Sequence, residues 1–355
     1  MVVNQWVPSA HRGDAVGDSA RRVRGLLRAM GHTADLFALA IDDDLVGDVR
    51  PFADPASRGG DVTILHFAVP SPMSAAFAAL SGGRVLQYHN ITPARFFAPY
   101  DQGLAQMTVR GRQELASLAG HTDLALGDSE FNRLELEALG FEPTGVVPIA
   151  VDVERIRRGP ARLPLEAALD DDKVNVLFVG RLVPHKRIED YVCLARMYEQ
   201  YIDDRCRFIF VGRTDGVPAY YARIWALIDR YRMKPERFLF TGTVADDELA
   251  AYYRAADVYL SLSEHEGFSV PLVEAMAADV PILAYDSTAV PETLGGAGVL
   301  FSPKDLEHAA ELVEILADDE DVRAAVIAGQ RARLGRFGDA RMAGDLAAVL
   351  ARVAS

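Results

Sequence analysis

Short hydrophobic runs alternate with amphipathic stretches along the whole chain. The runs predict strands, and stretches with apolar residues three and four apart predict helices between them. This alternation is typical of βαβ units with parallel sheets. The predicted strands are Val2–Val7, Val62–Phe67, Val85–Tyr88, Leu124–Leu126, Val174–Val179, Phe208–Val211, Phe238–Phe240, Val258–Leu262 and Ile282–Ala284, and the predicted helices are Ala15–Met30, Leu104–Leu118, Glu130–Leu139 and Ala340–Val353.

The pattern divides the chain into two domains. It weakens over Val151–Asp172, where Arg, Pro and Asp gather, and the turn-rich stretch Asp42–Asp61 predicts a loop. A length of 355 residues is comfortable for two domains. We therefore expect an N-terminal domain over residues 1–165, a C-terminal domain over 166–339, and a last helix over 340–355 that packs back on the first domain.

Composition narrows the function classes. The net charge of −14 repels phosphate backbones, which argues against nucleic-acid binding. The two cysteines form no C-x-x-C pair, so we expect neither a disulfide framework nor a zinc site. No charged segment precedes an apolar run at the N-terminus, and no apolar stretch approaches 18 residues, which predicts a cytoplasmic protein.

The segment from Ser263 to Ala277 carries the candidate chemistry. A predicted strand ends, Gly267 follows, and a helix begins with Ser269 as its expected N-cap. The free N–H groups of that first turn form an anion site. Glu266 precedes the helix and Glu274 lies roughly 6 Å further along the axis, so the two carboxylates suit two different polyols better than one shared proton. The alternatives are a helix-dipole partner for Glu266 and a solvated helix position for Glu274.

This segment resembles the E-x7-E signature of retaining glycosyltransferases, in particular glycosyltransferase family 4. Gly180–Lys186 is similar to the family's G-R-x-x-x-x-K segment, Phe210–Gly212 to its next strand end, and Phe240–Val244 to the turn that meets the nucleotide base. Val147–Asp152 resembles the strand that leads into the inter-domain linker, with Ile-Ala in place of the usual Asn-Gly.

The resemblance implies an α/β protein of the GT-B fold, with two Rossmann-like doubly wound domains that face each other across a cleft. It implies that Arg181 and Lys186 neutralise the leaving nucleoside diphosphate, and an Arg fork and a mobile Lys charge suit that task. It also implies that Glu266 contacts the donor sugar and Glu274 the ribose. The residues expected to bind the donor are Gly13, Gly180, Gly212, Val244, Gly267, Phe268, Ser269, Val270 and Glu274, and those expected to act in catalysis are Glu266, Arg181, Lys186 and His89.

The first domain supplies further candidates. His11–Asp18 resembles the family's N-terminal glycine loop, and a plain strand–helix turn is the alternative. His89 follows a predicted strand, where the resemblance implies a position beside the donor sugar and the alternative is a structural histidine. Asp14 and His66 are acceptor-side candidates.

Three arginines share one face of the first predicted helix. Arg21, Arg24 and Arg28 lie opposite its hydrophobic residues. A solvated face over a core face is the simpler interpretation. Contact with an anionic membrane or a lipid-diphosphate acceptor, at the inner face of the membrane, is the alternative.

As a whole, the resemblance implies a hexosyltransferase of polysaccharide biosynthesis that retains anomeric configuration. Gly13–Asp18 and Tyr88–Pro93 are similar to bacterial O-antigen and polysaccharide mannosyltransferases, so GDP-mannose is the first expected donor and a UDP-sugar the second, with a sugar or lipid-linked sugar as acceptor. A sugar-nucleotide epimerase and a non-catalytic nucleotide-sugar-binding protein remain alternatives. We expect no cofactor and no metal, because the D-x-D runs Asp42–Asp44 and Asp170–Asp172 lie in predicted loops and cationic side chains can serve the leaving group.

Overall fold

The computed structural model describes residues 1–353, which form two compact units. Within these residues, unit 1 comprises 1–95, 102–151 and 336–353, and unit 2 comprises 96–101 and 152–335. The chain therefore leaves unit 1 after Val151 and returns to it at Arg336. The stretch expected to be a linker forms two short helices of unit 2 instead. The last two residues of the predicted C-terminal helix lie outside the described residues.

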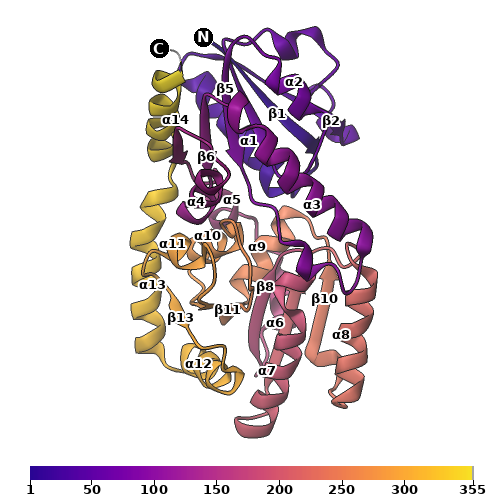
Figure 1. Cartoon of the computed structure of the whole chain (residues 1–355). Helices are drawn as coiled ribbons and strands as arrows, with labels where there is room; N and C mark the ends of the chain where they lie inside the picture. The colour runs from indigo at the N-terminus through magenta and orange to yellow at the C-terminus, as the bar shows by residue number, and fades with distance from the viewer. Residues whose placement is uncertain (354–355) are drawn as a thin grey trace. The chain divides into compact units, whose positions relative to one another are not determined.

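Unit 1 is a parallel sheet with the strand order β3-β2-β1-β4-β5-β6-β7 (Figure 1). Its first strand lies between the second and the fourth, so the order reverses beside β1. Its strands are β1 Val2–Ala10, β2 Thr33–Ile41, β3 Arg50–Pro51, β4 Val62–Phe67, β5 Gly83–Tyr88, β6 Leu124–Gly127 and β7 Thr144–Val146, and its helices are α1 Ala15–Ala29, α2 Met73–Ala78, α3 Gln102–Ser117, α4 Glu130–Ala138 and α14 Asp339–Val353.

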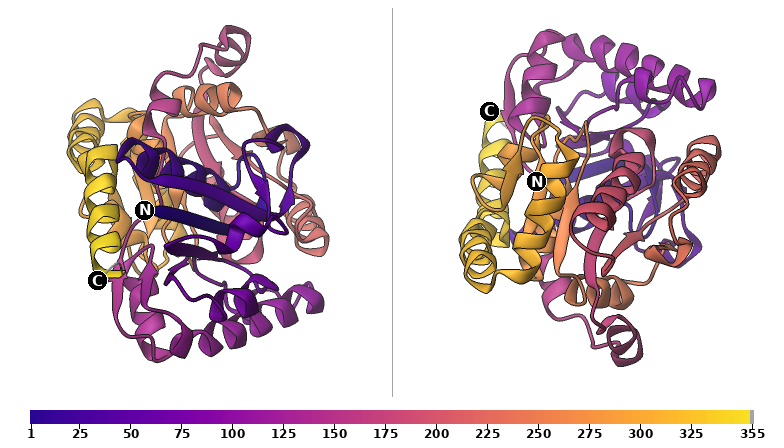
Figure 2. Two further views of the ribbon diagram at one scale, coloured as in Figure 1. Left: turned by 90° about the horizontal axis from the view of Figure 1, so that it is seen from above. Right: turned by 90° about the horizontal axis from the view of Figure 1, so that it is seen from below.

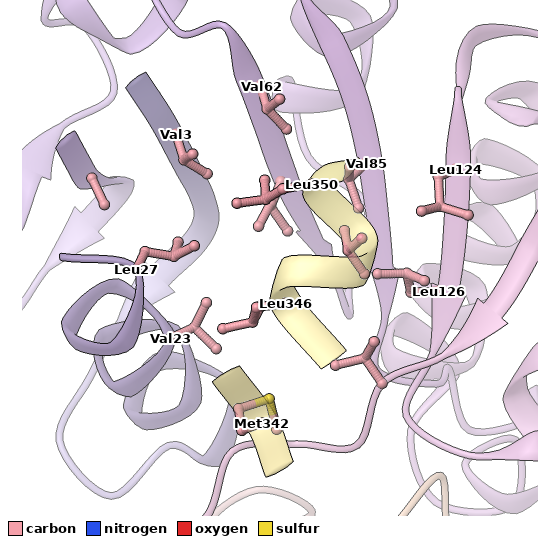
Figure 3. Close-up of a cluster of buried hydrophobic side chains, with 14 of the residues drawn as sticks. Val3, Val23, Leu27, Val62, Val85, Leu124, Leu126, Met342, Leu346 and Leu350 are labelled. Carbon is pink, nitrogen blue, oxygen red and sulfur yellow. The ribbon is translucent and has the colours of Figure 1, made fainter. Parts of the chain in front are cut away.

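Alternating side chains of the unit 1 strands fill two cores, one on each face of the sheet. In β4, Val62 and Ile64 join the core beneath α1 and α14, whereas Leu65 and Phe67 join the core on the opposite face. Figure 3 shows how α14 presents Met342, Leu346 and Leu350 to that first core. Figure 2 shows the same helix, in yellow, close to the indigo N-terminal strand. The end of the chain thus completes the core that its first strand begins.

Unit 2 repeats the design with the order β10-β9-β8-β11-β12-β13, again with parallel pairs. Its first strand lies between β9 and β11, which is the switch point where open α/β sheets bind ligands at their carboxyl ends. Its strands are β8 Val174–Val179, β9 Cys206–Val211, β10 Phe238–Gly242, β11 Val258–Ser261, β12 Ile282–Tyr285 and β13 Val299–Phe301, and its helices are α5 Val153–Arg157, α6 Leu163–Leu169, α7 Ile188–Tyr201, α8 Pro218–Arg230, α9 Asp246–Arg254, α10 Val270–Ala277, α11 Val290–Leu294, α12 Leu306–Asp318 and α13 Glu320–Leu334.

Two parallel sheets with flanking helices confirm the predicted fold class. The strands Val62–Phe67 and Val174–Val179 have the predicted bounds. The pattern missed β2, because three successive residues, Leu36, Phe37 and Ala38, are all buried and the next one, Leu39, is exposed, so burial does not alternate. The Asp42–Asp61 stretch is a loop only in part, since it contains β3 and two single 3-10 turns, Asp43–Leu45 and Pro55–Arg58.

Candidate functional site

Three glycines meet at the carboxyl edge of the unit 2 sheet. The N–H of Gly180 donates to Val211 O, and the N–H of Gly212 donates to Gly242 O at 2.9 Å. A Cβ on Gly212 would lie 2.1 Å from Gly180 O, and the φ of Gly212 is +143°. Only glycine therefore allows this close approach of β8 to the chain that follows β9.

The two predicted cations follow β8 on the same edge. Arg181 is exposed, and within residues 1–353 its guanidinium makes no hydrogen bond or ion pair. Lys186 ends a 3-10 turn, Pro184–Lys186, and its Nζ lies 2.6 Å from Glu266 Oε1. The structure thus brings two of the predicted catalytic residues into direct contact.

Glu266 is held by the loop that follows β12. Its N–H donates to Thr288 Oγ1 at 2.8 Å, and the Thr288 hydroxyl donates to Glu266 O at 2.9 Å. Two residues earlier, the N–H of Glu264 donates to His185 O at 2.8 Å. The loop from Ser263 to Gly267 is therefore tied to two neighbouring strand ends, which fixes the main chain that carries the buried Glu266 carboxylate.

The start of α10 differs from the expected cap. Ser269 occupies the N-cap position, but its φ of +76° is left-handed and its side chain caps no N–H. The expectation of a serine side-chain cap is wrong. Val270 is the first helical residue, and the N–H groups of such a first turn lack acceptors within the helix. Phe268 is buried and its carbonyl accepts from the Thr293 hydroxyl, so the chain is anchored just before the helix.

Glu274 is buried within the second turn of α10 and both of its oxygens are bound. Arg155 of α5 donates to Glu274 Oε1 at 2.7 Å, and the Tyr253 hydroxyl of α9 donates to Oε2 at 3.0 Å. Burial and the adjacent carboxylate raise the pKa of Tyr253, which keeps its hydroxyl protonated as a donor. Arg155 also contacts Asp246 at 3.1 Å. A solvated position for Glu274 is therefore excluded.

Val244, the residue expected to contact the nucleotide base, follows the neighbouring strand β10. Val244 is half-buried two residues beyond β10, next to the Gly212–Gly242 bridge. The structure therefore collects Arg181, Lys186, Glu266, Val244 and the start of α10 on loops at the carboxyl ends of the unit 2 strands.

In unit 1, the loop between β1 and α1 contains two of the candidates. Gly13 is exposed with a φ of +71°, which favours glycine. Asp14 caps α1, since its Oδ2 accepts from the N–H of Gly17 at 3.1 Å. This cap accounts for Asp14 on structural grounds alone.

His66 and His89 lie together at the ends of β4 and β5. His66 Nδ1 is 2.9 Å from His89 Nε2, and His89 Nδ1 is 2.8 Å from Asp128 Oδ2. His66 is buried, and the side chain of His89 is only 2% exposed although the residue as a whole is half-buried. The accessible atoms of His89 are therefore main-chain atoms.

The arginines of α1 are all engaged inside unit 1. Arg21 pairs with Asp18, Arg24 with Asp48 and Arg28 with Asp35. Arg24 is buried, so the expectation of a solvated face is wrong at that position. These pairs leave the membrane alternative without support from the helix.

Sequence reasoning missed the residues that hold the two glutamates. Arg155, Tyr253 and Thr288 are 21 to 119 positions distant from their partners. Lys304 was also missed, although its Nζ contacts Leu262 O at 2.8 Å and Asp190 Oδ2 at 2.7 Å. Nothing in their local patterns marks these residues, because only the tertiary fold brings them to the site.

Two searches of residues 1–353 bear on metals and membranes. No group of three or more His, Cys, Asp or Glu side chains is placed to hold a metal ion there. No helix in that range combines the length and apolar character needed to cross a membrane.

Comparison with known proteins agrees with this geometry. Residues 164–333 match the family model "Glycosyl transferases group 1". Among curated proteins, the chain is 27% identical to the serotype-specific mannosyltransferase WbdA of Escherichia coli over 145 residues, which are 41% of this chain and 18% of that protein. It is 30% identical to a GDP-mannose-dependent alpha-mannosyltransferase of Mycolicibacterium smegmatis over 258 residues, which are 68% of this chain and 60% of that protein. The chain thus spans less than two thirds of the length of either relative.

The fold also matches solved structures over nearly the whole chain. HepE of Anabaena, crystallised with UDP and glucose, superposes with a TM-score of 0.74 at 18% identity and covers 99% of both chains. The chain therefore has the GT-B fold, residues 164–333 are similar to the glycosyl transferases group 1 family, and the chain resembles the bacterial polysaccharide mannosyltransferases.

Proposed function

We propose that this protein is a hexosyltransferase that moves a hexosyl unit from a nucleoside diphosphate sugar to an acceptor hydroxyl with retention of anomeric configuration. The observation that carries the proposal is the Lys186–Glu266 contact of 2.6 Å beside the exposed Arg181, all at the switch point of the unit 2 sheet. A carboxylate for sugar hydroxyls and two cations for a diphosphate are the groups that such a transfer needs.

The proposed roles follow from burial and charge. Arg181 is exposed and uncommitted to any described partner, so it is available to a diphosphate oxygen. Lys186 is positioned to bridge that diphosphate and Glu266, and the first turn of α10 supplies N–H donors for phosphate or sugar oxygens. Glu274, buried beside Arg155 and Tyr253, is proposed to accept hydrogen bonds from the ribose hydroxyls through its carboxylate oxygens. The acceptor hydroxyl attacks from the face that the diphosphate leaves, and a phosphate oxygen takes its proton.

GDP-mannose is the proposed donor and a sugar or lipid-linked sugar the proposed acceptor. The names of the two mannosyltransferase relatives support mannose, and one of them is named for GDP-mannose. A UDP-sugar is the second candidate, because HepE was crystallised with UDP and glucose.

Transfer itself is the decisive test. The full chain is incubated with radiolabelled GDP-mannose or UDP-glucose and a panel of sugar acceptors, and products are separated to distinguish transfer, hydrolysis and epimerisation. Glu266→Gln should lower kcat at least 100-fold, because it removes the charge that Lys186 and the sugar hydroxyls share. Lys173→Gln is the matched control, since it breaks an exposed Lys–Asp contact of the same 2.6 Å length, and it should leave kcat within about twofold. Normal turnover of Glu266→Gln, or an epimerised donor as the product, would sink the proposal.

We propose that the leaving diphosphate is stabilised by Arg181, Lys186 and the start of α10 and needs no metal. EDTA should therefore leave the initial rate unchanged, whereas Arg181→Ala should lower it. A rate that EDTA abolishes and Mg²⁺ restores would refute this part of the proposal.

A further inference from the structure

A chain of hydrogen-bonded, buried polar side chains crosses the sheet of unit 1 from the middle of β1 to the carboxyl ends of β4, β5 and β6. It runs from Gln5 on β1 through His66 on β4 and His89 after β5 to Asp128 after β6, and Gln87 closes its far end. The side chain of Asp128 is 1% exposed and that of His89 is 2% exposed. Their hydrogen-bond partners are therefore protein groups rather than solvent. The positions of the protons can therefore be derived from the partners.

Gln5 determines which ring nitrogen of His66 carries a hydrogen. Its Nε2 donates to Ala20 O at 3.0 Å, so the amide nitrogen faces that carbonyl and Oε1 faces His66. Oε1 only accepts, and His66 Nε2 at 2.9 Å must carry the hydrogen between them. Full burial and the neighbouring ring lower the pKa of His66 well below its usual range, which keeps His66 neutral. Its Nδ1 is consequently a bare acceptor.

The protonation of His66 in turn determines where His89 carries its hydrogens. Because His66 Nδ1 accepts, His89 Nε2 at 2.9 Å must donate to it. At the other end, Gln87 Nε2 donates both to Val147 O and to Asp128 Oδ1, so Oδ1 carries no hydrogen. The 2.8 Å contact between Asp128 Oδ2 and His89 Nδ1 still needs one hydrogen. The His89–Asp128 pair therefore holds one proton more than a neutral imidazole and a carboxylate.

We propose that this proton resides on His89, which is a buried imidazolium held between Asp128 and His66. Imidazole is more basic than a carboxyl group by more than about two pKa units in water, and Asp128 offers the charge partner that His66 lacks. The arrangement leaves His89 no lone pair, so its ring serves neither as a base nor as a nucleophile.

The pinned ring has a positioning role, and this part rests on the proposed function. Asn90, the next residue, adopts a left-handed φ of +73° and its side chain donates to Asn132 and Glu135. The main chain of His89 and Asn90 is thus fixed from both sides at the carboxyl end of β5. Asp128 and His66 are positioning residues that present this main chain, rather than the ring, to a ligand.

The proton assignment is tested by NMR on the full chain with ¹⁵N-labelled histidine rings. In the wild type at neutral pH, one histidine should have both ring nitrogens protonated, and this signature should be lost in Asp128→Asn. Asp42→Asn is the matched control, because it removes the carboxylate from the exposed His11–Asp42 pair of 2.7 Å, and it should leave the signature intact. A wild type without a doubly protonated histidine at neutral pH overturns the proposal, even if Asp128→Asn does not fold.

A second variant, His66→Gln, tests which of the two histidines carries the positive charge. In His66→Gln the amide nitrogen can donate to Gln5 and the amide oxygen can accept from His89. The amide thus replaces both the donor and the acceptor of the neutral His66 ring. The doubly protonated signal should therefore persist. Its disappearance would place the proton on His66 and overturn the assignment to His89.

Activity then tests the positioning role. Asp128→Asn should lower kcat for transfer about tenfold or more, while Lys173→Gln, which breaks the exposed Lys173–Asp171 contact in unit 2, stays within about twofold. Full activity of a folded Asp128→Asn variant that has lost the NMR signature overturns the positioning role. If the wild type transfers no sugar at all, the proposed function fails, and the NMR result still decides the proton assignment.

Discussion

At the scale of single residues, each carboxylate of the candidate site forms an ion pair with a basic side chain. Glu266 is matched by Lys186, and Glu274 by Arg155. A buried charge that loses its partner costs far more than an exposed pair contributes. The partner cations should therefore matter for stability as well as for chemistry.

Arg155 provides the clearest case. Arg155→Met removes the cation that donates to Glu274 Oε1, and Glu274 is only 3% exposed. We expect the free energy of unfolding of unit 2 to fall by about 2 kcal/mol, below the full cost for a buried pair because Arg155 itself is partly exposed. Arg162→Met is the control, since Arg162 forms an exposed pair with Asp247 from the same connecting segment to the same helix, and it should cost less than about 1 kcal/mol. Equal losses in urea denaturation would contradict this view of Glu274.

At the scale of secondary-structure elements, α14 is the piece on which the unit 1 core depends. Met342, Leu346, Val349 and Leu350 are buried against residues from β1, β4, β5 and β6. Since these strands precede α14 by more than 200 positions, the helix contributes long-range packing rather than local structure.

Leu346→Ala should remove buried apolar contacts at the centre of this helix (Figure 3). We expect a loss of about 2–4 kcal/mol in the unfolding free energy of unit 1. Ala347→Ser changes the neighbouring exposed position of the same helix and should cost no more than about 0.5 kcal/mol. If calorimetry showed the same small change for both, α14 would not be part of the cooperative core.

The elements themselves were largely predictable, whereas the contacts within the site were not. Strong periodicity located α1, α3 and α4, and buried runs located β4 and β8 within a residue or two. The strand Thr33–Ile41 escaped because its burial does not alternate. The left-handed Ser269 escaped because a serine before a helix normally caps it, and only the closure of the loop onto α10 imposes a positive φ.

At the scale of the whole molecule, buried histidines should shape the pH response. Burial, together with the charges of Lys186, His265 and Arg181, lowers the pKa of His185 well below its usual range. Its folded pKa lies below its unfolded pKa, so the unfolded chain binds the proton first as the pH falls. The contribution of His185 to stability is therefore present above about pH 6.5 and lost below it.

The comparison of wild type with His185→Asn isolates this effect. From pH 7 to pH 5.5, the wild type should lose about 1 kcal/mol of unfolding free energy relative to the variant. Urea denaturation at both pH values measures the difference. If the difference in unfolding free energy between the two proteins were the same at both pH values, His185 would take up its proton equally well in the folded and the unfolded state.

The return of the chain to unit 1 at Arg336 has a consequence for biosynthesis. The sheet of unit 1 is encoded before residue 147, but its core is completed by a helix that begins at Asp339. On the ribosome, residues 152–335 of unit 2 are made while the face of the unit 1 sheet that α1 covers still lacks α14. Residues 152–335 of unit 2 form one continuous segment that can fold during synthesis, whereas unit 1 cannot complete its core until α14 has been made. The half of the protein that is translated first should thus be the last to reach its native state.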